Sequence, residues 1–183
     1  MTLKKITVKE CAYCALFAAL TFAGSLIKVP MPAGYSYITL QTLFVSLSGV
    51  VLGPKLGAIS QLLYIILGIL GVPVFTEGGG IMYLFKPSFG YIIAWIPSAY
   101  LAGYIAKKLN RGYIGALLAM LAAIVPVYAI GIPYTYVALR VFMGKSVFLL
   151  PMIQASVLAF LPGDILKAVL GAFAAVKIKK LPK

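Results

Sequence analysis

Six long segments without any charged residue dominate this sequence. A helix needs about 20 apolar residues to cross the hydrocarbon core of a bilayer. The six segments are 17 to 28 residues long and cover residues 11–27, 29–54, 56–76, 87–106, 112–139 and 146–163. Little of the 183-residue chain is left between them, so we expect no second, soluble domain. The sequence therefore predicts an all-α integral membrane protein, a single bundle of six transmembrane helices formed by residues 1–183.

The ionisable residues exclude most enzyme classes. The chain has no histidine and only three acidic residues, Glu10, Glu77 and Asp164, which excludes a histidine base, a His-based zinc site and a di-metal carboxylate cluster. Cys11 and Cys14 form a C-x-x-C pair inside an apolar run without a second pair of ligands, so they are interpreted as helix-packing residues. We therefore expect no catalytic residue, no metal and no cofactor.

A nucleotide-binding loop is also excluded. Gly144-Lys145-Ser146 matches the end of the phosphate-binding motif, but the glycine required five positions before Gly144 is replaced by Leu139. The glycine run at 78–80 is not followed by the Lys-Ser or Lys-Thr of that motif. If this protein concentrates a solute, the energy must come from a partner or from an ion gradient.

The basic residues predict the orientation in the membrane. The formal net charge is +13, and eleven basic residues fall on one set of connections: Lys4, Lys5, Lys9, Lys55, Lys107, Lys108, Arg111, Lys177, Lys179, Lys180 and Lys183. The opposite connections carry Lys28, Lys86, Arg140 and Lys145. By the positive-inside rule, both termini are predicted to be cytoplasmic in a multi-pass protein of the cell membrane. Topology and anionic lipid explain the basic excess, and no nucleic-acid partner is expected.

Glycine and proline positions predict the limits of the helices. The first two expected helices cover residues 8–28 and 37–52, a tight turn at residues 53–57 follows, and the third helix ends at about residue 70. The last three expected helices cover residues 88–107, 112–143 and 146–179, with a break in the last one at Pro162-Gly163. Residues 29–36 are predicted to form an external loop. Residues 72–87 form an apolar, glycine-rich connection between helices 3 and 4, which we expect to pack on the protein because irregular backbone at membrane depth must be buried or face a cavity.

Asp164 and Lys167 are the strongest candidate site residues. Their spacing of three places both side chains on one face of a helix. Pro162 and Gly163 are expected to restart the helix, so that Asp164 lies in its first turn, where the helix dipole favours a carboxylate. Charges inside a span are functional candidates by default, and the alternative is a structural ion pair.

Two further features carry functional information. The connection from Glu77 to Lys86 brings an acid, a base and several glycines to the same outer side, although a solvated hairpin would have the same composition. Cys11, Ala15, Ala19 and Ala23 follow one another at intervals of four. Such small-residue faces allow close helix approach in lipid, either to a partner or within the protein's own bundle.

Several of these segments together resemble a known family. They are ITLQTL (38–43), LGPKLGAISQLLYIILGILGVPVFTEGGG (52–80), KPSFGY (86–91) and FLPGDILK (160–167). In this order the segments are similar to the BioY family, the biotin-binding substrate components of energy-coupling factor (ECF) transporters. The resemblance covers most of the chain.

The resemblance implies a six-helix protein that captures biotin near the outer face. The implied partners are a transmembrane coupling subunit and two cytoplasmic ATPase subunits. In such proteins an alanine-rich face of helix 1 meets the coupling subunit, which corresponds here to Ala15 and Ala19. Release of the ligand by rotation of the whole component in the bilayer is also implied.

The chemistry of biotin suggests roles for individual residues. Asp164 can accept bonds from the ureido N–H groups, and Lys86 and Lys167 are the cations available for the carboxylate and the carbonyl, in an order left open. Gln41 offers a donor and an acceptor, with Tyr37 one helical turn before it. The expected apolar walls and the glycine run of the site add Phe75, Tyr83, Tyr91 and Gly79.

Two positions depart from the pattern expected for many relatives. Glu77 stands where an asparagine or a small residue is expected, and Lys86 where a glycine or an arginine is expected. Glu77 is either neutralised by Lys86 or directed at ureido N–H groups. A gradient-driven carrier of another small organic solute, such as a biotin precursor, is the alternative function.

Overall fold

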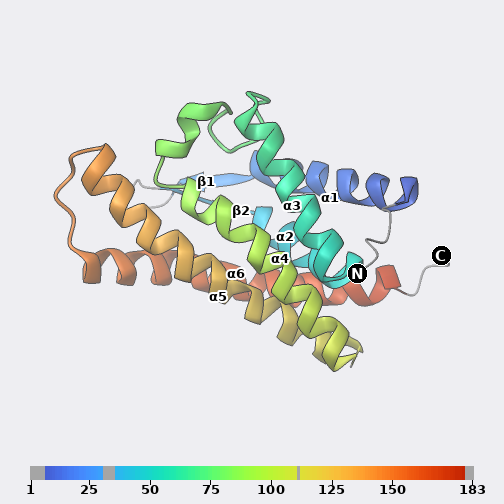
Figure 1. Ribbon diagram of the computed structural model, residues 1–183. Helices are drawn as coiled ribbons and strands as arrows, with labels where there is room; N and C mark the ends of the chain where they lie inside the picture. The colour runs from blue at the N-terminus through green and yellow to red at the C-terminus, as the bar shows by residue number, and fades with distance from the viewer. Residues whose placement is uncertain (1–6, 31–35, 111, 180–183) are drawn as a thin grey trace, which may run out of the picture.

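The computed structural model describes residues 7–30, 36–110 and 112–179. These residues contain six α-helices: α1 (Val8–Leu26), α2 (Gln41–Leu52), α3 (Pro54–Ile69), α4 (Phe89–Leu109), α5 (Gly112–Val137) and α6 (Leu149–Lys179) (Figure 1). A 3-10 helix, η1 (Ile81–Phe85), lies between α3 and α4, and a π-helical turn, η2 (Ala138–Phe142), continues α5. The predicted six-helix bundle is confirmed.

The connections gather at two ends of the molecule. The start of α1, the end of α6 and the α2–α3 and α4–α5 turns lie toward one end, which we call the basic end (Figure 1). The opposite loop end holds the segment between α3 and α4 and the connection between α5 and α6. Five of the basic residues used to predict the orientation lie outside the described residues: Lys4, Lys5, Arg111, Lys180 and Lys183. The cytoplasmic placement of the termini stays a prediction.

A short β-hairpin replaces the expected start of the second helix. Strand β1 (Lys28–Pro30) pairs antiparallel with β2 (Tyr37–Thr39), with Lys28 opposite Thr39. The predictions of a helix from residue 37 and of Tyr37 one helical turn before Gln41 are therefore wrong. The β-branched residues Ile38 and Thr39 favour extended backbone. Helical periodicity is a local pattern, so it does not predict the pairing of β2 with β1.

The last helix is continuous, which corrects a second expectation. α6 runs for 31 residues with Pro162 inside it. A proline removes a single backbone donor, and membrane helices tolerate this because the freed groups find other partners. Asp164 is therefore in the middle of a helix, and the expected stabilisation by a helix N-terminus does not apply.

The helices differ in their ability to span a bilayer. Among the described residues, three apolar helical stretches are long enough to cross a membrane alone: Phe89–Leu109, Gly112–Phe142 and Leu149–Ile178. α2 has only 12 residues, which at 1.5 Å per residue gives about 18 Å. Since the hydrocarbon core is about 30 Å thick, α2 cannot cover it alone. Its first residue, Gln41, is buried, so this first turn lies inside the bundle.

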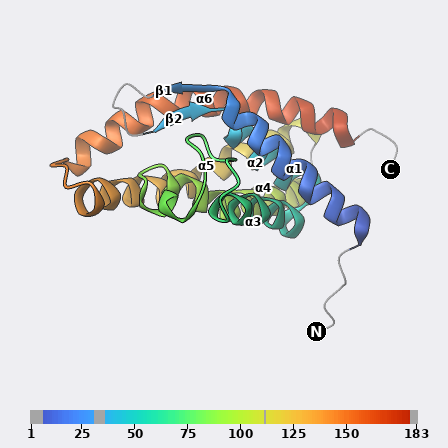
Figure 2. The ribbon, with the colours of Figure 1, turned by 90° about the horizontal axis from the view of Figure 1, so that it is seen from above.

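Close helix packing fixes the frame around this first turn. A side chain at Gly49 of α2 would overlap the backbone of Ala99 on α4, and one at Gly103 would overlap the α2–α3 turn. Small residues allow such approach between membrane helices. α4 and α6 each pack on α2 and on α5, and Figure 2 shows α6 along one side of the molecule and α4 along the other.

The small-residue face of α1 does not pack in the bundle. Cys11, Ala15, Ala19 and Ala23 are all exposed. The buried side of α1 is formed by Cys14, Phe17, Ala18, Thr21, Gly24 and Ser25. The alternative in which the small residues serve internal packing is therefore wrong.

Candidate ligand-binding site

A cavity lies at the loop end, bordered by α2, α4, α5, α6 and the hairpin. Its empty volume is about 570 Å³ when its open mouth is included. Six residues singled out in the sequence line it together: Tyr37, Gln41, Tyr83, Tyr91, Asp164 and Lys167. The structure thus brings residues from five separate segments of the chain around one space.

Asp164 and Lys167 form a buried ion pair in the wall of this cavity. The Nζ of Lys167 is 2.6 Å from the Oδ1 of Asp164, and the two residues are only 8% and 7% exposed. The one-turn spacing within α6 brings the two groups together. Removing one partner of a buried pair leaves an uncompensated charge, so each residue requires the other.

Three neighbouring elements hold the pair in place. Thr42 on α2 donates to Oδ1 of Asp164 (3.0 Å), and Tyr128 on α5 donates to Oδ2 (2.9 Å). Lys167 also donates to the Thr42 hydroxyl (2.7 Å) and to the carbonyl of Thr39 on β2 (3.0 Å). All three ammonium hydrogens of Lys167 are thus used, whereas a carboxylate with about four acceptor sites keeps capacity for a further donor.

Gln41 connects the cavity to the loops that cover it. Its Nε2 donates to the Tyr64 hydroxyl (2.7 Å), and its Oε1 accepts from Thr39 and Thr76 (both 3.1 Å). Tyr64 in turn donates to the carbonyl of Val74 (2.7 Å). Gln41 therefore ties α2 to α3, to β2 and to the segment before η1, and the described residues provide an acceptor for one of its two amide hydrogens.

Aromatic side chains form much of the wall. Tyr91 and Phe160 pack edge to face across α4 and α6, with ring centroids 5.7 Å apart. Tyr83, from η1, lines the cavity near its mouth, and Trp95 lines it from α4. An apolar wall with a few placed polar groups is the usual composition of a small-molecule site.

Glu77 and Lys86 do not line this cavity, but they contact two residues that do, Tyr37 and Tyr83, and we call this side of the cavity its mouth. The Lys86 ammonium is 3.1 Å from a Glu77 carboxylate oxygen, and the Tyr37 hydroxyl donates to the other oxygen (3.2 Å). Glu77, Lys86 and Tyr37 also line a second, wider hollow of about 960 Å³ that reaches Lys145, which we call the loop-end hollow. Of the two interpretations of Glu77, the structure shows neutralisation by Lys86.

The Glu77 charge and burial keep two phenols protonated. The Glu77 carboxylate raises the pKa of Tyr37 above its ordinary value, chiefly through charge repulsion of the phenolate. Burial raises the pKa of Tyr83. Both hydroxyls therefore remain hydrogen-bond donors at the mouth throughout the physiological pH range.

Two residues expected in the site lie behind it. Phe75 is buried between α3 and η1, where its ring fills the space beside Gly68 and packs on Tyr83, 4.6 Å between centroids. Gly79 lies against Val72 and Gly68 with no room for a side chain. Neither lines the cavity among the described residues. Both support the wall because the apolar segment folds back on α3.

The residues of the cavity wall that were not predicted from the sequence include Thr39, Thr42, Trp95, Tyr128 and Phe160. Thr39 and Thr42 lie close to Gln41 in the ITLQTL segment. The presence of three polar residues in this otherwise apolar segment could have predicted that both threonines belong to the site. Tyr128 and Trp95 lie in apolar spans, where aromatic residues are common. Nothing local in the sequence distinguishes these two from other aromatic residues.

Together, the fold and the site define a class of protein. The chain is a multi-pass membrane protein with a cavity between its helices, and a buried carboxylate lines this cavity. The family model described as the BioY family matches residues 1–183. This chain belongs to the BioY family.

Individual relatives agree with this assignment. The chain is 39% identical over 148 residues to a "Probable biotin transporter BioY" of Lysinibacillus sphaericus, with 79% of this chain and 73% of the relative covered. It is 35% identical over 184 residues to the "Biotin transporter BioY" of Rhizobium etli, with 91% of each chain covered. The crystal structure of "the S-component for biotin from an ECF-type ABC transporter" matches with a TM-score of 0.82 and 29% identity, over 100% of this chain and 96% of that one.

We expect Tyr128→Phe to lower the stability of the protein. The substitution removes the donor to Oδ2 of Asp164, and a hydrogen bond to a charged group contributes about 1.5–3 kcal/mol. Tyr104→Phe on the exposed side of α4 is the matched control. Thermal unfolding in detergent should give a lower midpoint for Tyr128→Phe only, and equal midpoints would show that the bond adds nothing.

Proposed function

We propose that this chain is the biotin-binding S-component of an ECF-type importer. It captures biotin from the outer side and delivers it inward together with a transmembrane coupling subunit and two cytoplasmic ATPase subunits. The observation that carries the proposal is the buried Asp164 carboxylate, which faces a cavity with acceptor capacity to spare. The names of the relatives and of the similar crystal structure support biotin as the ligand.

The ureido ring of biotin suits the deep part of the cavity. This ring presents two N–H donors and one carbonyl acceptor, and Asp164 offers a charge-assisted acceptor. Lys167, whose three hydrogens are engaged, positions Asp164 and compensates its charge. Tyr91, Phe160 and Trp95 supply apolar contact for the fused rings.

The valerate tail then extends toward the mouth, where Lys86 is the available cation. The Lys86 ammonium lies 4.9 Å from the centroid of the Tyr83 ring, which lines the cavity. One of its three hydrogens faces Glu77, and two remain for the ligand carboxylate. This assigns Lys86 to the carboxylate and leaves Glu77 as a residue that holds Lys86 in position.

The exposed small-residue face of α1 is the proposed contact with the coupling subunit. Ala15 and Ala19 are exposed, and their side chains are small. A partner helix can therefore approach the α1 backbone closely at these positions. The remaining exposed apolar side chains of the helices face lipid. With both termini cytoplasmic, the cavity opens to the outer side.

The first test is calorimetric titration of the purified protein in detergent with biotin. We expect one-to-one binding, and we expect Asp164→Asn to weaken it at least a hundredfold because the amide loses the charge and half of the acceptor capacity. Glu10→Gln, the same acid-to-amide change in the first turn of α1 and away from the cavity, is the matched control and should retain tight binding. If Asp164→Asn binds within about threefold, or about 0.7 kcal/mol, the carboxylate is not a principal contact.

Lys86→Met should weaken biotin binding by about threefold to tenfold, the range of a partly exposed ion pair. The same substitution should leave the affinity for biotin amide, which lacks the charge, nearly unchanged. Lys145→Met, in the loop-end hollow, is the control for a general loss of positive charge. Equal losses for biotin and its amide would place the carboxylate elsewhere.

Ala15→Leu combined with Ala19→Leu should abolish uptake and spare binding. The added side chains prevent close approach of the coupling subunit to α1 but touch nothing in the cavity. Ala129→Leu, on the exposed side of α5, controls for bulk in the membrane. Biotin uptake is measured in vesicles that contain the complete transporter. Uptake by this chain alone under an imposed gradient would instead favour the carrier function.

A further inference from the structure

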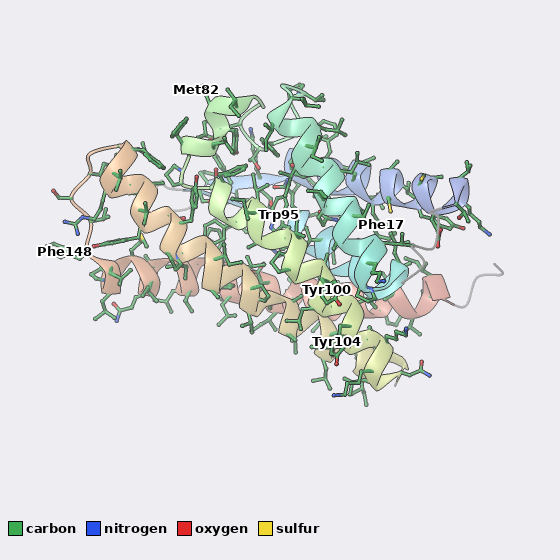
Figure 3. All side chains as sticks on the ribbon, viewed as in Figure 1. Phe17, Met82, Trp95, Tyr100, Tyr104 and Phe148 are labelled. Atoms are coloured by element: carbon green, nitrogen blue, oxygen red, sulfur yellow. The ribbon has the colours of Figure 1, made fainter. Side chains whose placement is uncertain are left out.

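The indole nitrogen of Trp95 is a buried hydrogen-bond donor in the described part of the chain. Trp95 is the single tryptophan of the chain, lies on α4 near the middle of the molecule (Figure 3), and is only 3% exposed. Among the described residues, its Nε1 has no hydrogen-bond partner. Buried polar groups are almost always paired, so an unpaired one in the wall of a binding cavity calls for a ligand acceptor.

The described neighbours of the indole supply no hydrogen bond to Nε1. Val45, Ile92 and Val127 pack in the same apolar cluster as Trp95. The Tyr64 ring lies beside it, 5.6 Å between centroids, but the Tyr64 hydroxyl already accepts from Gln41 and donates to a backbone carbonyl. Because Trp95 lines the cavity, a bound ligand is the candidate acceptor for Nε1.

The position of Trp95 relative to the Asp164–Lys167 ion pair indicates which part of biotin lies next to the indole. Trp95 on α4 and Asp164 on α6 both line the cavity, and α4 and α6 run along opposite sides of the molecule (Figure 2), so we place the two residues on facing walls. With the ureido ring on Asp164 and the carboxylate at the mouth, the opposite edge of the fused bicycle faces Trp95. In biotin this edge carries the thioether sulfur, a weak and polarisable acceptor suited to an apolar wall.

We propose that Nε1 of Trp95 donates a hydrogen bond to the ring sulfur of biotin. This inference rests on the proposed function and assigns Trp95 the role of distinguishing the sulfur ring from sulfur-free analogues of the same shape. The sulfur preference of the site is then separate from its ureido recognition by Asp164.

The test compares biotin with its carbocyclic analogue, in which CH2 replaces the sulfur. The wild-type protein should bind biotin about threefold to tenfold more tightly, the range of one net hydrogen bond. Trp95→Phe should bind both ligands with equal affinity because it keeps an aromatic ring and loses the N–H group. Phe160→Leu, which alters the opposite wall, should weaken both ligands and retain the preference for biotin.

A second variant guards against a folding defect in Trp95→Phe. Because the chain has one tryptophan, growth on the benzothiophene analogue of tryptophan replaces Trp95 alone and keeps the shape of the ring while removing the donor. Loss of the preference in this protein supports the sulfur contact. A wild-type protein that binds both ligands equally, or variants that retain the preference, overturn the inference and leave the proposed function intact. Failure of the wild type to bind biotin at all overturns both.

Discussion

The buried ion pair between Asp164 and Lys167 is the constraint on which the rest of the site depends. Charged groups at membrane depth are costly unless each is paired and hydrogen-bonded. Here the pair lies within one helix, yet its remaining partners come from α2, α5 and β2. The cost of an unsatisfied charge thus holds four elements in fixed positions around the cavity, and it leaves Asp164 ready to accept from a ligand.

The short second helix makes this arrangement possible. Because α2 begins at Gln41, well inside the bundle, the polar start of the helix faces the cavity instead of the membrane surface. The hairpin and the apolar segment before η1 cover the space that a longer helix would occupy. Gln41 accepts hydrogen bonds from Thr39 of the hairpin and from Thr76 of the apolar segment. The first residue of α2 therefore both marks the deep start of the helix and fixes the two segments that cover the cavity.

Sequence reasoning succeeded where the signal is local and failed where it depends on packing. The length of the charge-free segments predicted six helices, and the spacing of Asp164 and Lys167 predicted a shared face, both of which the structure shows. The break at Pro162 was predicted from a preference that membrane helices override. Phe75 was expected in the wall, but an apolar ring in a folded-back segment can face either side, and here it faces α3.

The sequence by itself determined the class of the molecule, the number of its helices and the pairing of its two intramembrane charges. These follow from run length and helical periodicity, which act within a few turns of one helix. The tertiary structure alone decided which residues meet the pair: Thr42 lies 122 positions from Asp164, and Tyr128 lies 36. It also decided that Trp95 lines the cavity and that its donor has no partner among the described residues. Such contacts depend on the depth and rotation of each helix against its neighbours, and close packing at residues such as Gly49 sets both.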